Sequence, residues 1–334
     1  MDQKNDFHKL DSYVVTSQRS GTPVLRLGFQ MQLYLRGGET REARHRAVDV
    51  LAGFAEAASG NITHWQKHMA SRLTKIAGPD AFAALHAEVD RIDPEAEIHG
   101  PHVTDAQQPP RWQGAALMQP GRAAPVDLSM LHLAMPATIV RADPDDLIAR
   151  LLDWCAQARP LHGTAGLAPI YEIGMQQSHP VETWPLLSRF SGLDYMNAFP
   201  LAARGVNQVQ GVNWLTILGQ PILDEIGGTE ALAARLAQAW RALEPMARPD
   251  APLPPEYALH PFAGGVLVRA GEWPQLGDRN IGGVPLTYRV VAQALRPWLF
   301  TAYPNKPTQL IKVPRPLDAH AETLAWITRF DQEG

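Results

Sequence analysis

The sequence predicts an α+β fold, in which helices pack on a largely antiparallel sheet. Strand-like and helix-like stretches both occur along the 334 residues, but they do not alternate regularly as they do in a parallel α/β sheet. The 29 prolines are spread along the chain, which favours loops and short elements over long helices. The order strand, helix, strand recurs at about 24–118 and 128–173. We therefore expect two similar halves, although their sequences share no identity.

The length permits one large domain or two smaller ones. We expect residues 1–334 to form a single α+β domain, and the alternative is a division into subdomains at 20–180 and 181–334. The apolar fraction of 45% is that of an ordinary soluble globular protein, so the chain has enough apolar side chains for a sizeable core.

The stretch 24–35 predicts a long strand. Its odd-numbered positions from Leu25 to Leu35 are apolar. The even-numbered positions are more polar and include Arg26, Gln30, Gln32 and Tyr34. This alternation is typical of a strand with one polar or solvent-facing side.

Three helices are predicted next. Thr40 is a suitable N-cap for the first, which ends at Gly60. The second covers 63–76, where four residues form an apolar stripe: Trp65, Met69, Leu73 and Ile76. The third begins at Pro79-Asp80 and buries Phe82, Leu85 and Val89.

Strands are then predicted at 112–118 and 128–140. Asp143-Pro144 marks a helix start, because aspartate is a preferred N-cap and proline fits the first helical position. Pro160 ends that helix, and a strand at 162–173 and a short helix at 184–190 follow.

The remaining chain is organised around 209–228, with the sequence VQGVNWLTILGQPILDEIGG. Its first part predicts a central strand at 206–218 that is apolar on most positions of both faces, as expected for a strand covered on both sides. It holds no His, Cys or phosphate-binding glycine loop, so we interpret it as scaffold. Further elements are a helix capped by Thr229, a strand at 262–269, and a final helix capped by Asp318 that buries Leu324, Ile327 and Phe330.

Composition excludes several classes of protein. A net charge of −4 gives no support for direct nucleic-acid binding, which usually accompanies a basic surplus. Cys155 is the single cysteine, so an intrachain disulfide is excluded and a reducing compartment is indicated. The polar N-terminus lacks the apolar segment of a signal peptide, and no apolar run is long enough to span a membrane.

The spacing of several histidines raises the question of a metal site. His64 and His68 would share one face of the predicted helix, but Trp65 stands where a metalloprotease has its catalytic glutamate. His99 and His102 lie near several acids, and His162, Glu172 and His179 form a second loose group. A solvated helix face and ordinary polar strand-edge residues explain these groups better than a metal site, and Cys155 lies on the predicted buried face of its helix.

Two segments carry a family resemblance. FSGLDY at 190–195 and VNWLTILG at 212–219, followed by a Gly-Gly pair that opens a helix, resemble the DUF3396 family of type VI secretion immunity proteins, often called TsiV-like. The resemblance implies a cytoplasmic antitoxin that binds a cognate antibacterial effector, commonly a nuclease, and occludes its active site or substrate channel. It implies no catalytic residue, cofactor or metal ligand in this chain.

Two groups of residues are candidate partner contacts. The first is an acidic segment, which would match the positive cleft of a nuclease: Glu88, Asp90, Asp93, Glu95 and Glu97. The second is the loop around Trp273 and Arg279, two residue types that often anchor interfaces. The polar side of the first strand is a further candidate. For the acidic segment, a solvated loop without a partner is the competing interpretation.

Two other functions remain open from sequence alone. One is a metal-dependent hydrolase that uses the scattered His and Glu residues, which elemental analysis of the purified protein would reveal. The other is an adaptor within a secretion apparatus, which genetic context would separate from immunity. The cognate toxin and the oligomeric state do not follow from the sequence.

Overall fold

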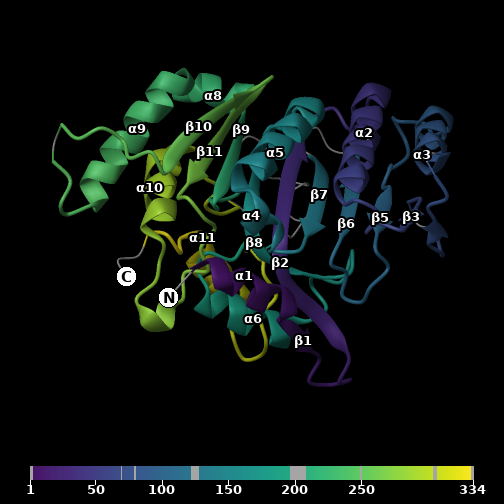
Figure 1. Cartoon of the computed structure of the whole chain (residues 1–334), viewed down its shortest axis with the longest axis horizontal. Helices are drawn as coiled ribbons and strands as arrows, with labels where there is room; N and C mark the ends of the chain where they lie inside the picture. The colour runs from purple at the N-terminus through teal and green to yellow at the C-terminus, as the bar shows by residue number, and fades with distance from the viewer. Residues whose placement is uncertain are drawn as a thin grey trace.

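The computed structural model describes residues 3–68, 70–78, 80–121, 128–195, 208–248, 250–303 and 307–331 (Figure 1). Its strands are β1 (Val14–Thr16), β2 (Pro23–Leu35), β3 (His64–Gln66), β4 (Thr74–Lys75), β5 (His102–Thr104), β6 (Gln113–Leu117), β7 (Ser129–Met135), β8 (His162–Ile170), β9 (Leu215–Gly219), β10 (Tyr257–Phe262) and β11 (Gly265–Ala270). Its α-helices are α1 (Gln3–Ser12), α2 (Arg41–Ala57), α3 (Asp80–Arg91), α4 (Ile139–Ala142), α5 (Pro144–Ala158), α6 (Pro180–Arg189), α8 (Gln220–Ile226), α9 (Gly228–Leu243), α10 (Leu286–Leu295) and α11 (Ala319–Ile327). Two 3₁₀ turns are η1 (Arg279–Ile281) and η2 (Arg296–Trp298).

One sheet of 11 strands holds the molecule together. Its order is β10-β11-β9-β8-β2-β7-β6-β5-β3-β4, with β1 paired to β2. Every pair of these strands is antiparallel, which confirms the predicted α+β class. The prediction of a central strand at 206–218 was wrong. Strand β9 covers only its last part, residues 206–207 lie outside the described residues, and β2 occupies the middle of the sheet.

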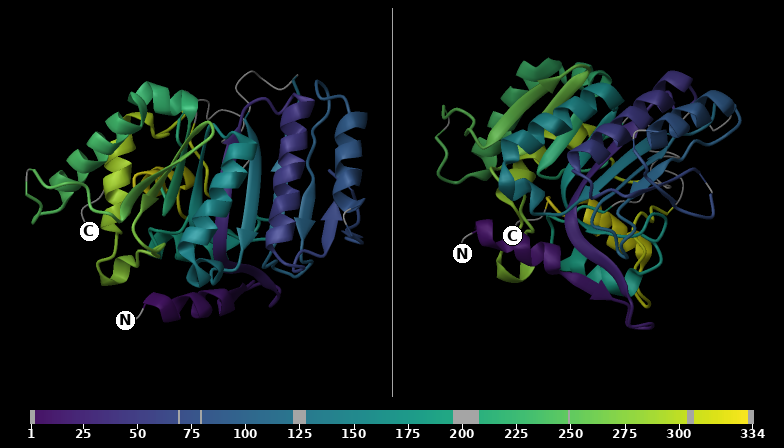
Figure 2. Two further views of the ribbon diagram at one scale, coloured as in Figure 1. Left: turned by 45° about the horizontal axis from the view of Figure 1, so that its top comes forward. Right: turned by 45° about the vertical axis from the view of Figure 1, so that its right-hand side comes forward.

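Helices cover both faces of the sheet. Helices α2, α3 and α5 lie over one face, whereas α6 and α11 lie on the other side (Figure 2). Strands β7 and β8 flank β2, so α5 crosses over β2 as a strand–helix–strand unit, as predicted for 128–173. The predicted partner unit at 24–118 is less regular, because β3, β4, α3 and β5 lie between α2 and β6.

Local chemistry explains where the main helices begin. The Thr40 hydroxyl accepts a hydrogen bond from Ala43 N at 3.2 Å, and the Asp143 carboxylate accepts bonds from the amides of Asp145 and Asp146. Both side chains satisfy amides that lack partners at a helix N-terminus. Helix α2 then packs closely on the sheet, because a Cβ atom at Gly114 would lie 2.8 Å from the Leu51 side chain.

The even-numbered side of β2 is polar, as predicted, but it is not solvent-facing from Gln30 to Tyr34. Gln30, Gln32 and Tyr34 are all buried, and neighbouring strands add His132 and His162 to the same buried side. The loops after β8 help to cover it, since Gln113 donates to the carbonyl of Tyr171 and Thr164 donates to Asp194. Both sides of β2 therefore belong to the interior, and its polar side is unavailable to a partner.

The predicted helix at 63–76 was also wrong. The segment instead forms β3 and β4, which pair with each other and extend the sheet beyond β5. Leu73, assigned to the apolar stripe, is 41% exposed, and Met69 lies outside the described residues. Backbone pairing with β5 decided the conformation here, and no periodicity within the segment reveals a distant partner strand.

Several boundaries also moved. Strand β7 ends at Met135 before Pro136, and the segment to 140 enters α4. The predicted strand at 262–269 is β11, preceded by the unpredicted β10 of the same hairpin. Gly227 rather than Thr229 stands at the N-cap of α9. Asp318 does cap α11, but Leu324 and Ile327 are only partly buried, and Thr323 and Trp326 fill the interior instead.

Candidate partner-binding surface

The acidic segment covers the last turn of α3 and the turn after it, and it divides into one buried and four exposed residues. Glu88 is buried, with Oε2 3.8 Å from His99 Nε2, and burial raises the pKa of Glu88. Asp90, Asp93, Glu95 and Glu97 are exposed. Buried Arg44 holds their turn in place by donating to the carbonyls of Pro94 at 3.0 Å and Glu97 at 2.7 Å. The segment thus presents four carboxylates on a fixed backbone.

A chain of hydrogen bonds fixes Asp90 and joins α3 to α2. Asp90 Oδ1 lies 3.1 Å from His45 Nε2, and the Nδ1 atoms of His45 and His86 are 2.8 Å apart. The other nitrogen of His86 lies 3.2 Å from Asp49 Oδ1. The two rings stack with their centroids 5.1 Å apart. These contacts pair each histidine with a carboxylate from the opposite helix.

The second candidate group lies in the loop that follows β11. Trp273 is half-buried and packs against Phe7 of α1, with ring centroids 6.1 Å apart. Arg279 begins the turn η1 and is exposed, although partial burial lowers its pKa. Ile281, two residues further on, is 84% exposed. Ile281 was not among the predicted contacts, although an isolated apolar residue between Gly277 and a Gly-Gly pair is typical of a loop tip.

The structure does not bring the two groups together. The acidic segment leads into β5 and the loop follows β11, and these strands are six steps apart in the sheet. At a strand spacing of about 4.8 Å, that separation is roughly 29 Å. A standard interface covers about 800 Å² on each partner, roughly 30 Å across. A contact centred on one group therefore leaves the other outside.

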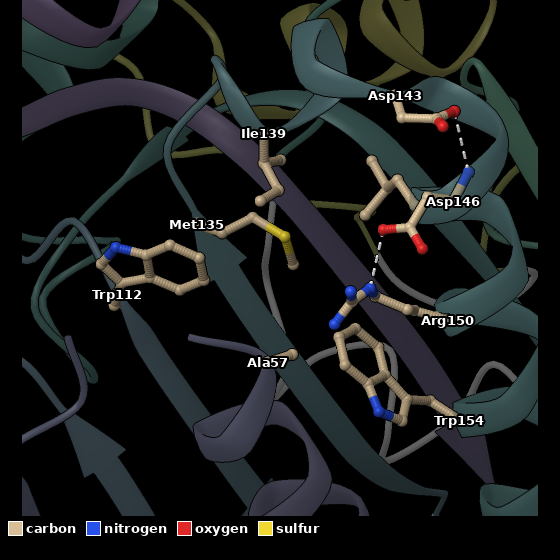
Figure 3. A pocket seen from close by; sticks show the side chains of 9 residues that line it. Ala57, Trp112, Met135, Ile139, Asp143, Asp146, Arg150 and Trp154 are labelled. Atoms are coloured by element: carbon tan, nitrogen blue, oxygen red, sulfur yellow. Dashed lines mark hydrogen bonds and ion pairs between the residues drawn. The ribbon is translucent and has the colours of Figure 1, made fainter. Parts of the chain in front are cut away.

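An apolar pocket opens between α5, α4 and the end of β7 (Figure 3). It has a volume of about 100 Å³. Six apolar side chains contribute to its lining: Ala57, Trp112, Met135, Ile139, Leu147 and Trp154. Its charged neighbours are already engaged, since Arg150 pairs with Asp146 at 2.9 Å and Asp143 caps α5. Trp112 also lines a more polar hollow of about 450 Å³.

The histidines considered as metal ligands are dispersed. His64 and His68 share no helix face, because 64–66 form β3. Burial lowers the pKa of His99 and His102 to about 4 and that of His162 to about 3. In the described part of the chain, no three His, Cys, Asp or Glu side chains are placed to hold a metal ion. Cys155 is buried, and burial raises the pKa of its thiol.

The motif residues form internal supports. Trp214 is fully buried, donates from Nε1 to the carbonyl of Gly271 at 2.9 Å, and packs edge-on against Phe29. The Asn213 side chain lies over Gly166 and accepts a hydrogen bond from the amide of Trp214. These contacts are those of the scaffold predicted from the sequence.

None of the helices in the described ranges is both long and apolar enough to cross a membrane. A comparison with curated proteins finds no match. Among solved structures, the chain is similar to the Pseudomonas aeruginosa T6SS protein PA0821, with a TM-score of 0.76 and 19% sequence identity. That similarity covers 98% of this chain and 90% of the other, and it establishes a shared fold.

The profile of the TsiV family, described as type VI immunity for VRR-NUC, matches residues 48–330. This range is most of the chain, and it includes both motifs from which the resemblance was first seen. The chain therefore belongs to the TsiV family of type VI immunity proteins.

Proposed function

We propose that this chain neutralises a cognate VRR-NUC nuclease effector of a type VI secretion system by binding it and covering its active site or substrate channel. The observation that carries this proposal is the family match over residues 48–330. The described geometry agrees with a binding protein: its exposed carboxylates and the loop after β11 are held on rigid supports.

In this function the chain acts as a stoichiometric binder in the cytoplasm and makes or breaks no covalent bond. A net charge of −4 and the exposed carboxylates near α3 suit contact with a protein that must itself attract DNA phosphates. The chain itself has no basic surplus for contacting DNA.

Co-expression tests the proposal. The product of the neighbouring gene, which the proposal expects to be a VRR-NUC nuclease, is produced in a bacterial host with and without the chain, and viability and co-purification are measured. We expect the nuclease alone to kill the host, and the chain to restore growth and co-purify with it. Persistent killing at matched soluble expression would contradict the proposal. An adaptor of the secretion apparatus would instead leave the toxicity unchanged and affect only delivery of the effector.

A further inference from the structure

The loop Gly277–Gly283, which we name the hook, projects from the lower end of the molecule in Figure 1, where it is coloured lime below α10. It presents an apolar side chain and a cation next to each other. Ile281 exposes 84% of its area at the tip. Arg279 is an exposed cation whose side chain makes no hydrogen bond or ion pair with any described residue, as judged from residues 3–331 outside the gaps.

The hook is held rigidly from below. Arg189 forms a bidentate ion pair with Asp278, with its shortest N–O distance at 2.6 Å. The Ser191 amide donates to the carbonyl of Gly277, and the Gly192 amide donates to that of Leu276 at 2.7 Å. A Cβ atom at Gly192 would lie 2.0 Å from the Gln275 oxygen, so only glycine permits this approach.

The turn itself is also closed by hydrogen bonds. Asp278 accepts bonds from the amide of Asn280 through its side chain and from the amides of Ile281 and Gly283 through its carbonyl. Gly277 and Gly282 have φ values of +66° and +82°, which favour glycine. Rigid presentation lowers the entropy lost when such a tip enters a partner.

The family motif lies directly under this loop. Three of its residues, Phe190, Ser191 and Gly192, pair with the base of the hook. Buried Arg329 donates to the carbonyl of Ser191 at 2.9 Å and to that of Val212 in the second motif segment. The motif therefore acts as the support of the hook, and the hook carries the exposed side chains.

Charge around Arg279 indicates what the partner supplies. Burial lowers the pKa of Arg329, the charge of Asp194 raises it, and the positive charge of Arg279 lowers it by a smaller amount. The nearest carboxylate in sequence, Asp278, is already committed to Arg189. The Arg279 side chain has no carboxylate partner among the described residues, so its charge is available to attract one from outside. A bound partner would supply that carboxylate.

We propose that the hook is the anchor of the effector complex, with Ile281 inserted into an apolar pocket of the nuclease and Arg279 paired with a carboxylate at its rim. This inference rests on the proposed function, because it identifies the surface that performs it. Arginine is enriched among the few residues that dominate binding energy at interfaces.

The test measures the affinity of the purified VRR-NUC effector for full-length variants by titration calorimetry. We expect Ile281→Asp and Arg279→Glu each to weaken binding by at least ~30-fold, the scale of an interface hot spot. Arg279→Ala should weaken binding less than Arg279→Glu, because only the reversal adds repulsion. Arg189→Ala, which loosens the hook without changing its tip, should weaken binding to a smaller extent.

The loop after α9 provides a matched control, since Met246 is 88% exposed and Arg248 follows it at the same spacing. Met246→Asp and Arg248→Glu should bind the effector as tightly as the parent does.

If the parent binds and the hook variants bind within twofold of it, the hook assignment is wrong while the proposed function stands. Equal binding by Arg279→Ala and Arg279→Glu would overturn the carboxylate pairing. If the parent does not bind, the proposed function fails.

Sedimentation analysis of the free chain tests whether the hook instead mediates self-association. The hook could serve contact between two copies of this chain, and Ile281→Asp would then dissociate an oligomer of the parent. That result would overturn the assignment of the hook to the effector. An unchanged sedimentation coefficient supports it.

Discussion

Trp214 lies where the segment before β9 enters the interior. It is fully buried, and its indole nitrogen bonds to the Gly271 carbonyl at the end of β11. Gly271 also begins the loop that leads to the hook. A single side chain therefore links the core of the sheet to the base of the proposed binding surface.

Replacing Trp214 by alanine is expected to lower the free energy of unfolding by about 3–5 kcal/mol, because it removes a buried aromatic and leaves a cavity. Urea unfolding measures the change. Trp240→Ala, at a half-buried position of α9, should cost less. A Trp214→Ala variant as stable as the parent but unable to bind the effector would contradict the scaffold assignment.

Buried histidines make the stability of the fold dependent on pH. Burial lowers the pKa of His132 and His162 to about 3 and that of His102 to about 4. The unfolded chain, with histidine pKa values near 6.5, therefore binds more protons than the folded chain between these values. Stability is complete above about pH 6.5 and falls as the pH decreases towards 4.

Chemical denaturation at a series of pH values tests whether the free energy of unfolding falls as the pH decreases. We expect the free energy of unfolding to decrease steadily from pH 6.5 to 4, and His132→Gln to reduce the slope. The control His8→Gln is at an exposed position of α1 and should leave the slope unchanged. A stability that is flat or rises on acidification would show that these rings are not buried as neutral groups.

At the scale of elements, the acidic segment beside α3 and the hook beside α10 have different expected roles. They are roughly 29 Å apart across the sheet at the usual strand spacing. If the hook is the anchor, the carboxylates near α3 act at long range, and charges outside a contact mainly affect the rate of association.

Glu95→Lys combined with Glu97→Lys is therefore expected to slow association with a basic effector and to weaken its salt dependence, while the dissociation rate stays the same. Stopped-flow measurements at low and moderate salt follow both rates. The control is Glu225→Lys combined with Glu230→Lys, which makes the same change in net charge at exposed positions of α8 and α9. A faster dissociation would place Glu95 and Glu97 inside the contact. An unchanged association rate would show that the acidic segment plays no part in binding.

Across the whole molecule, signals that lie close together in sequence predicted the structure well. The caps Thr40, Asp143 and Asp318 each bond to amides two or three residues away, so the sequence contains everything that the helix start requires. The alternation in 24–35 identified the strand, but burial of its polar side depends on loops from 171 to 195. The predictions of a helix from His64 to Lys75 and of a strand from 208 to 214 were wrong for the same reason, since pairing with distant segments decides the conformation there.

The candidate surface was predicted only in part. Arg279 was selected for its residue type, but the rigidity of the hook arises from Arg189 and Asp278, which are 89 positions apart. No local sequence pattern predicts an ion pair between residues so far apart in the chain. Similarly, Glu88 belongs to the acidic run in sequence, yet its contact with His99 places it inside. The family motif was recognised from sequence, whereas its position beneath the hook required the fold.

The most direct test of the account is a titration of the purified effector's nuclease activity on DNA with this chain. We predict that activity falls linearly and is abolished at one chain per effector, because each chain covers one effector and is not released. Loss of activity at a small fraction of that ratio would reveal turnover and contradict a stoichiometric binder. Full activity in the presence of excess folded chain would contradict immunity by occlusion altogether.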